Sequence, residues 1–185
     1  MKKKLIPIIA LALIAVIAIT TVVFAICSVN YKPNFTELEK CQICIQENSS
    51  GALTLIEDEE QSKKLNDLFN SSFNESALNS LFNGRLGYSA ELIKNQTAIS
   101  DITKLDKYIY FDYINKDNLP TIKYNNEDIS FDRLLIKIES LNTTNLGQIN
   151  IYLLQEDAIS SSYYYKTYGN FYNFFKYINE TVLAE

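Results

Sequence analysis

Two cysteines stand at the spacing of a redox motif. Cys41 and Cys44 form a Cys-x-x-Cys sequence, and redox-active motifs of this kind lie at a helix N-terminus, where the helix dipole lowers the pKa of a thiol. Here residues 41–47 alternate in polarity, which indicates a strand with the two sulfur atoms on opposite faces. Three residues along a strand span about 10 Å, too far for the Cα atoms of a disulfide. We therefore expect no disulfide between them.

Histidine is absent from the sequence. Ser-His-Asp and Cys-His hydrolases, His-ligated zinc sites and histidine acid-base catalysis all need an imidazole. An enzyme could use carboxylates such as Asp112 or Asp132, but the sequence gives them no defined mutual geometry. The acidic run at 57–60 lacks the spacing and the glycine of a calcium loop, so it indicates the start of a helix. We predict no catalytic residue, no cofactor and no metal.

Aromatic residues are concentrated near the C-terminus, where nine of the fifteen positions from 163 to 177 are Tyr or Phe. The phenylalanines suit the apolar stripe of a helix, whereas each buried tyrosine hydroxyl needs a hydrogen-bond partner. Exposed tyrosines are typical of surfaces that bind a sugar, a peptide or a protein, although plain packing explains them too. Gly169 and Asn170 follow the cluster, so we expect it at a connection. The candidate binding patch comprises Tyr163, Tyr164, Tyr165 and Tyr168.

Seven Asn-x-Ser/Thr sequences follow the apolar N-terminal run. Each is an acceptor for a glycan if the host has the machinery. The alternative is that Asn and Ser gather in loops because both residues form turns. The possible glycosylation sites are Asn34, Asn48, Asn70, Asn74, Asn95, Asn142 and Asn179.

Residues 5–26 contain no charged side chain and follow three lysines. A helix of that length spans about 33 Å, enough for the hydrocarbon core of a bilayer. We predict a cytoplasmic segment at 1–4, a transmembrane signal-anchor at 5–26, and an extracytoplasmic remainder, because lysines stay on the cytoplasmic side. The apolar run is longer than that of a cleaved signal peptide. The alternative is a secreted or lipid-anchored chain cleaved near Cys27, although Ile26 stands where a lipobox has a small residue.

The remainder divides into a stalk at 27–40 and one domain at 41–185. Residues 41–47 and 52–56 predict a hairpin, and Asp58 stands where the N-cap of a helix would. Asn74 is expected to cap a second helix over 74–83, which ends at Gly84. The buried stripe of this second helix is expected to be Ala77, Leu78, Leu81 and Phe82.

Strand patterns dominate the next part of the chain. They cover residues 86–94, 108–114, 129–139 and 148–155, with a tight hairpin turn at Asn125-Asn126. A last helix over 170–183 places Phe171, Phe174, Phe175, Ile178 and Val182 on one face. These elements predict an α+β fold, in which an antiparallel sheet of five to six strands has helices on one face and is preceded by the transmembrane helix.

Charge limits the possible partners. All 22 acidic residues but only 14 of the 17 basic ones follow the apolar run, so the remainder has a net charge of −8. That charge disfavours nucleic acid. We predict a membrane-anchored extracytoplasmic binding or interaction module that is not an enzyme. Its partners would be the lipid bilayer, through the N-terminal helix, and an extracellular protein or carbohydrate. The alternatives are an accessory subunit of an envelope membrane complex and a histidine-independent enzyme that uses carboxylates.

Overall fold

The computed structural model describes residues 2–26, 29–33, 41–85, 88–95, 104–113, 117, 119–139, 147–155 and 162–184. Its helices are α1 (Lys2–Ile26), α2 (Glu59–Ser72), α3 (Ala77–Phe82) and α5 (Tyr172–Tyr177), which continues as the π-helical turn η2 (Ile178–Val182). The N-terminal strands are β1 (Val29–Asn30), β2 (Gln42–Glu47), β3 (Ala52–Ile56), β4 (Asn74–Glu75) and β5 (Glu91–Asn95). The later strands are β6 (Lys107–Asp112), β7 (Thr121–Tyr124), β8 (Glu127–Ser130), β9 (Arg133–Lys137), β10 (Gln148–Leu154) and β11 (Ser162–Tyr168).

A seven-stranded antiparallel sheet forms the centre of the domain, in the order β3-β2-β6-β9-β10-β11-β5. The α+β class with an antiparallel sheet is therefore confirmed. The sheet has seven strands instead of five or six because the tyrosine-rich segment, expected at a connection, forms β11 and pairs with β10 and β5. The pairs β1–β4 and β7–β8 form two separate two-stranded sheets.

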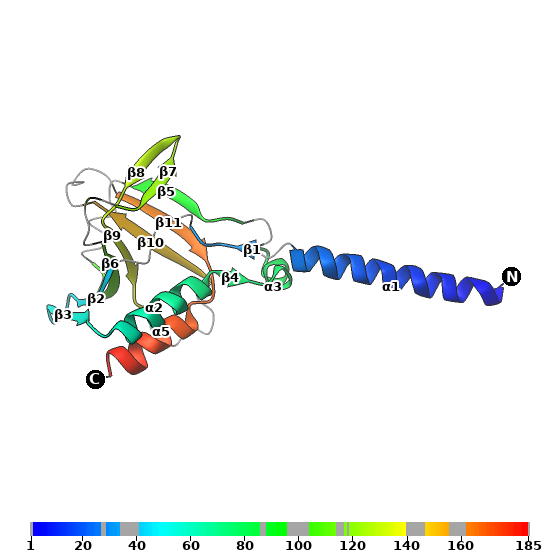
Figure 1. The fold of residues 1–185 in the computed structure, drawn as a ribbon, viewed down its shortest axis with the longest axis horizontal. Helices are drawn as coiled ribbons and strands as arrows, with labels where there is room; N and C mark the ends of the chain where they lie inside the picture. Colours follow the sequence, from blue (N-terminus) through cyan, green and yellow to red (C-terminus); the bar gives the residue numbers. More distant parts are fainter. Residues whose placement is uncertain are drawn as a thin grey trace.

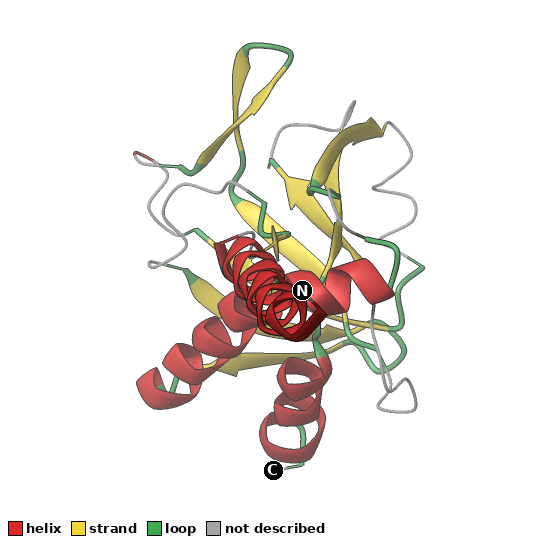
Figure 2. Ribbon diagram, turned by 90° about the vertical axis from the view of Figure 1, so that its right-hand side faces the viewer, coloured by secondary structure: helices red, strands yellow, loops and turns green. Residues whose placement is uncertain are grey.

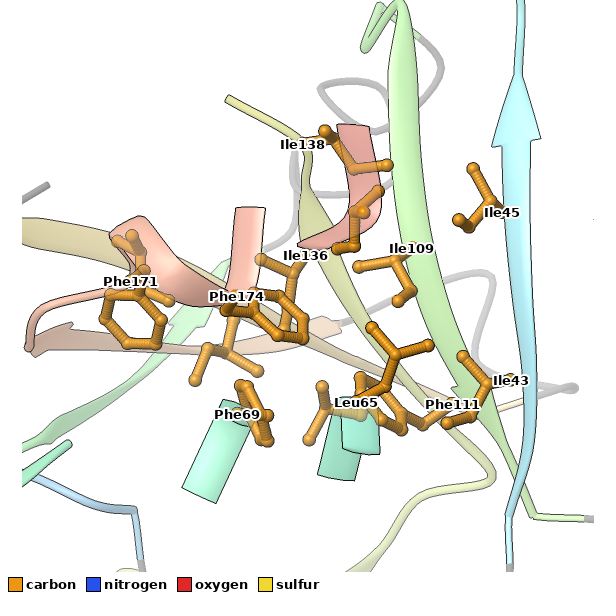
Figure 3. Packing of buried hydrophobic residues seen from close by; sticks show 14 of the residues in the cluster. Ile43, Ile45, Leu65, Phe69, Ile109, Phe111, Ile136, Ile138, Phe171 and Phe174 are labelled. Atoms are coloured by element: carbon orange, nitrogen blue, oxygen red, sulfur yellow. The ribbon is translucent and has the colours of Figure 1, made fainter. Parts of the chain in front are cut away.

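Helices α2 and α5 lie side by side on one face of the sheet, as Figures 1 and 2 show. Between these helices and the sheet, Phe69 of α2 packs against Phe174 of α5 with ring centroids 5.6 Å apart. The sheet contributes residues that lie in register on neighbouring strands, such as Ile109, Ile136 and Ile151. Figure 3 shows how the two helices direct their aromatic and aliphatic side chains onto these strands. This cluster is the main core.

Local sequence signals account for several element ends. The Asp58 carboxylate accepts a hydrogen bond from the backbone N–H of Gln61 at 2.7 Å and caps α2, as predicted. The turn between β7 and β8 has positive φ at Asn125 (50°) and Asn126 (69°), which is the backbone of a tight hairpin. The hairpin of β2 and β3 also forms as predicted.

Residues 29–33, which the prediction assigned to the stalk, pack against the domain, whereas residues 34–40 lie outside the described part. Strand β1 pairs with β4. Tyr31, which follows β1, is 0 % exposed. Its hydroxyl lies 2.5 Å from Ser80 Oγ and donates to the carbonyl of Arg85 at 3.1 Å. The folded domain therefore includes residues before Cys41. These contacts hold residues 29–31, which follow α1, against the domain.

Helix α3 differs from its prediction in both its cap and its buried face. Ser76 is the N-cap, accepting from the N–H of Asn79 at 3.2 Å, whereas Asn74 lies in β4. The buried residues are Ala77 and Ser80. The large apolar residues point outward, and they are Leu78 (49 % exposed), Leu81 (43 %) and Phe82 (80 %). The predicted stripe was wrong because Ser80 faces inward to bond the Tyr31 hydroxyl, which leaves the opposite face of α3, with its large apolar residues, exposed.

Two predicted strands have different bounds. In the predicted strand 86–94, residues 86–87 lie outside the described part, and β5 begins at Glu91. The predicted strand 129–139 divides into β8 and β9. The division falls at Phe131 and Asp132, whose N–H groups bond the carbonyls of Pro120 and Leu154. These hydrogen bonds lie where the chain passes from the β7–β8 hairpin to β9 of the main sheet. The predicted C-terminal helix forms, with its expected stripe buried.

Helix α1 projects away from the domain along its own axis (Figure 1). The structure describes its side chains for residues 7–21, and all of these are exposed. Taken over the described residues alone, no helix of the chain is both long and apolar enough to cross a membrane.

Candidate functional site

The face of the sheet opposite α2 and α5 carries a band of tyrosines. Because successive strand residues point to opposite sides, the residues between the core positions of β6, β10 and β11 lie on this second face. Tyr110 is in register with Leu135 of β9, Leu135 with Tyr152, and Tyr152 with Tyr164. Tyr108 lies two residues before Tyr110 on the same face. We call the surface formed by Tyr108, Tyr110, Tyr152 and Tyr164 the tyrosine face.

The tyrosine rings form two pairs around a buried leucine. The ring centroids of Tyr108 and Tyr110 are 6.1 Å apart, and those of Tyr152 and Tyr164 are 6.0 Å apart. Leu135, in register between the two pairs, is only 3 % exposed. The four tyrosines themselves are half-buried. The described part of this face is therefore already packed around Leu135, and its tyrosines stay partly accessible.

Charged residues border the tyrosine face. The guanidinium of Arg133 lies 5.9 Å from the ring centroid of Tyr110 and 3.4 Å from the carboxylate of Asp112. Lys137 pairs with Glu139 at 3.5 Å. A cavity of about 280 Å³ lies at this border, lined by residues of β9 and β10 and their ends, including Lys137, Glu139, Asn150 and Tyr152. The border therefore places positively and negatively charged side chains next to the aromatic rings of the tyrosine face.

Tyr108 and Tyr110 keep their hydroxyl protons near neutral pH, because the pKa of each is raised. Burial, together with a hydrogen bond to Cys44, raises the pKa of Tyr110 to about 12. Burial also raises the pKa of Tyr108. These hydroxyls therefore act as hydrogen-bonding groups near neutral pH and not as acids or bases.

The structure does not bring the four predicted tyrosines together. Tyr164 lies on the tyrosine face, whereas Tyr165 is buried in the main core. Tyr163 packs against the core and lies 5.3 Å from the ring of Tyr124 on β7. Tyr168 lies 4.3 Å from the ring of Tyr88, below the guanidinium of Arg85 at 5.2 Å.

Sequence reasoning missed three members of the tyrosine face: Tyr108, Tyr110 and Tyr152. The spacing of Tyr108 and Tyr110 at alternate positions of a predicted strand was a usable signal for a shared face. Tyr152 and Tyr164 are neighbours because β10 pairs with β11. The sequence near either residue does not indicate that pairing.

The two described cysteines are thiols, as expected from the strand geometry. Cys44 is buried on the tyrosine face and Cys41 is half-buried. Burial raises the pKa of Cys41 to about 12, and it raises the pKa of Cys44 as well. A raised thiol pKa opposes redox and nucleophilic chemistry.

The candidate carboxylates occupy different environments. Asp112 is half-buried beside Arg133, whereas Asp132 is buried with 3 % of its surface exposed. Within the described ranges, no group of three or more Cys, Asp or Glu side chains could hold a metal ion.

The glycosylation candidates are dispersed. Asn48 and Asn74 are exposed, whereas Asn70 and Asn179 are half-buried in α2 and η2. The amide of Asn48 donates to the carbonyl of Leu105 at 2.5 Å, and that of Asn179 donates to Phe175 at 2.8 Å. Asn95 ends β5. The other two candidates, Asn34 and Asn142, lie outside the described residues.

Comparison with protein-family models, with curated proteins and with solved structures gives no match. The functional conclusion therefore depends on the surface chemistry of this chain alone.

Proposed function

We propose that the protein is a membrane-anchored, extracytoplasmic, non-catalytic module that binds an extracellular protein or carbohydrate through the tyrosine face. The observation that carries this proposal is the register of Tyr110, Leu135, Tyr152 and Tyr164 across four neighbouring strands. The rigid sheet holds these rings, so little side-chain entropy is lost when a partner covers them.

The shape of the surface suits a macromolecule better than a small substrate. Small-molecule sites are concave and bury most of the ligand, whereas the cavity of about 280 Å³ lies at the border of the tyrosine face and not at its centre. Its hydroxyls remain able to bond a partner after the rings are covered. Asp112, one of the candidate carboxylates, is held in an ion pair with Arg133 at the border.

The anchor in this proposal is α1. The support for it is the uncharged run from 5 to 26 behind three lysines, and the exposure of the described side chains of a helix that leaves the domain (Figure 1). Exposed Ile, Leu and Val along a helix are favourable in lipid and costly in water. The same lysines imply an extracytoplasmic domain.

Site-specific photo-crosslinking in intact cells tests the binding surface. A photoreactive phenylalanine analogue replaces Tyr164 in the full-length chain. The matched control carries the analogue in place of Tyr177, a half-buried tyrosine of α5. We expect Tyr164 to yield a discrete cross-linked species and Tyr177 none. Equal labelling from both positions, or none from Tyr164, overturns the proposal.

A further inference from the structure

Helix α3 exposes its most apolar residues although it belongs to the folded domain. Leu78, Leu81 and Phe82 are 49 %, 43 % and 80 % exposed, while Ala77 and Ser80 face inward. A helix on the surface of a soluble domain normally has the opposite arrangement, with its large apolar residues toward the core. The apolar face of α3 must therefore meet something other than its own domain or water.

The position of α3 indicates what covers this face. Helix α3 contacts α1, and Figure 1 shows it at the end of α1 where the chain enters the domain. The described side chains of α1 form an exposed apolar surface. If α1 spans a bilayer, α3 therefore lies near the membrane surface from which α1 emerges.

A partly buried polar network holds α3 in that position. Ser80 lies 2.5 Å from the hydroxyl of Tyr31 and donates to the carboxylate of Glu75 at 3.0 Å. Glu75 in turn pairs with Arg85, which donates to the carbonyl of Gly147 at 3.2 Å. Through Tyr31 this network joins α3 to the segment that follows α1. Hydrogen bonds therefore fix α3 relative to Tyr31.

We propose that α3 is an interfacial membrane contact, with Leu78, Leu81 and Phe82 inserted into the outer leaflet beside α1. This inference rests on the proposed anchor. Short apolar helical faces lie in the plane of the interface, about 5–10 Å into the boundary between headgroups and acyl chains. Two contacts with the bilayer, α1 and α3, restrict the tilt of the domain. They also set the direction in which the tyrosine face is displayed.

Tryptophan fluorescence in vesicles tests this contact, because the chain has no tryptophan of its own. Three single-tryptophan variants of the full chain are reconstituted in phosphatidylcholine vesicles: Phe82→Trp as the probe, Leu13→Trp in α1 as the anchor probe, and Leu53→Trp as the matched control. Leu53 is also an exposed leucine (57 %), but it lies on β3, at the end of the domain far from α1 (Figure 1).

Phosphatidylcholine with bromine at either of two depths in its acyl chains serves as the quencher. We expect Phe82→Trp to have blue-shifted emission and to lose most of it to lipids brominated near the headgroups. Leu13→Trp should lose most of its emission to lipids brominated near the bilayer centre. Leu53→Trp should emit as in water and lose none.

The alternative outcomes separate the two proposals. If Leu13→Trp is quenched and Phe82→Trp emits as in water, the anchor holds and the α3 contact is overturned. Blue-shifted but unquenched emission from Phe82→Trp means that protein, such as a second copy of the chain, covers the face, which also overturns the contact. If Leu53→Trp is quenched as strongly as Phe82→Trp, quenching is not specific to α3, and the proposed contact is overturned. Absence of quenching at Leu13→Trp overturns the anchor and the contact together.

Discussion

The two faces of the seven-stranded sheet are built from alternate residues of the same strands, yet they carry different chemistry. Under α2 and α5, Ile109, Ile136 and Ile151 form a row without polar atoms in their side chains. On the other side the neighbouring row contains Tyr110, Leu135 and Tyr152. A face covered by helices excludes water permanently, so it uses residues that need no hydrogen bond. A face that is covered only when a partner binds can keep hydroxyl groups.

The two faces should therefore contribute differently to the stability of the fold and to binding. Aliphatic and phenylalanine side chains of the main core contribute through close packing, and every methylene removed leaves a cavity. Half-buried tyrosines contribute less to folding than fully buried phenylalanines, because part of each tyrosine still meets solvent. Substitutions on the helix-covered face should therefore test the fold, and substitutions on the tyrosine face should test binding.

The largest effect is expected from Phe174→Ala in the centre of the helix-covered face. Phe174 is fully buried and lies 5.6 Å from the ring of Phe69 and 5.3 Å from that of Phe175. Removing the ring should lower the free energy of unfolding by about 3–5 kcal/mol. Urea unfolding of the full chain in detergent, followed by circular dichroism, measures the change. A loss below about 1 kcal/mol, the range of surface changes, would contradict this packing.

Leu135→Ala probes the one fully covered aliphatic residue between the tyrosine pairs. It should cost about 2 kcal/mol, the lower end of the range for buried leucine, because the surrounding tyrosine rings can collapse toward the space. The same urea titration provides the measurement. Leu134→Ala, at the neighbouring position under the helices, is the matched control and should cost more. Equal losses would mean that both faces are equally packed.

Alkaline pH should weaken the fold without any substitution. Burial raises the pKa of Cys41 from 9.0 to about 12 and that of Tyr165 from 10.0 to about 12. Above pH 9 the unfolded chain loses these protons before the folded chain does, so unfolding releases protons and stability falls as pH rises toward 12. Stability should be flat below pH 9 with respect to these groups. Urea midpoints measured across this range check the slope, and a midpoint that rises with pH would contradict it.

Local signals in the sequence predicted a large part of this architecture. Asp58 as a cap, Asn125-Asn126 as a turn and the stripe around Phe174 all depend on residues close together in the chain. The reversed polarity of α3 had no such signal, because the Leu and Phe spacing that marks a buried stripe is the same when the stripe points outward. Which face of α3 is buried depends on the hydrogen bond between Ser80 and Tyr31, and Tyr31 lies 49 residues earlier in the chain.

The candidate site was predicted in part for the same reason. A run of tyrosines was visible, and alternation implied that neighbouring tyrosines would point to opposite faces. Only the pairing of β10 with β11 places Tyr164 beside Tyr152, and only the pairing of β6 with β9 and of β9 with β10 brings Tyr110 into the same row. Long-range strand order thus decided which tyrosines share a surface.

The smallest effect on stability is expected from Tyr164→Ser, whose proper control is its neighbour Tyr163→Ser. The two side chains leave the same strand in opposite directions. Tyr163 packs against the main core and Tyr124, so its loss should cost about 1–2 kcal/mol from burial and ring contact. Tyr164 is also half-buried and has ring contact with Tyr152, but it lies on the face opposite the main core, so its loss should cost less than about 1 kcal/mol.

Binding should follow the opposite order. With the photoreactive analogue placed at Tyr152, beside the substituted residue, Tyr164→Ser should abolish the cross-linked species while leaving the urea midpoint nearly unchanged. Tyr163→Ser should lower the midpoint and leave cross-linking intact wherever the protein remains folded. If Tyr164→Ser unfolds the domain, or if it cross-links as before, the tyrosine face is a structural surface of the sheet and not the surface that meets a partner.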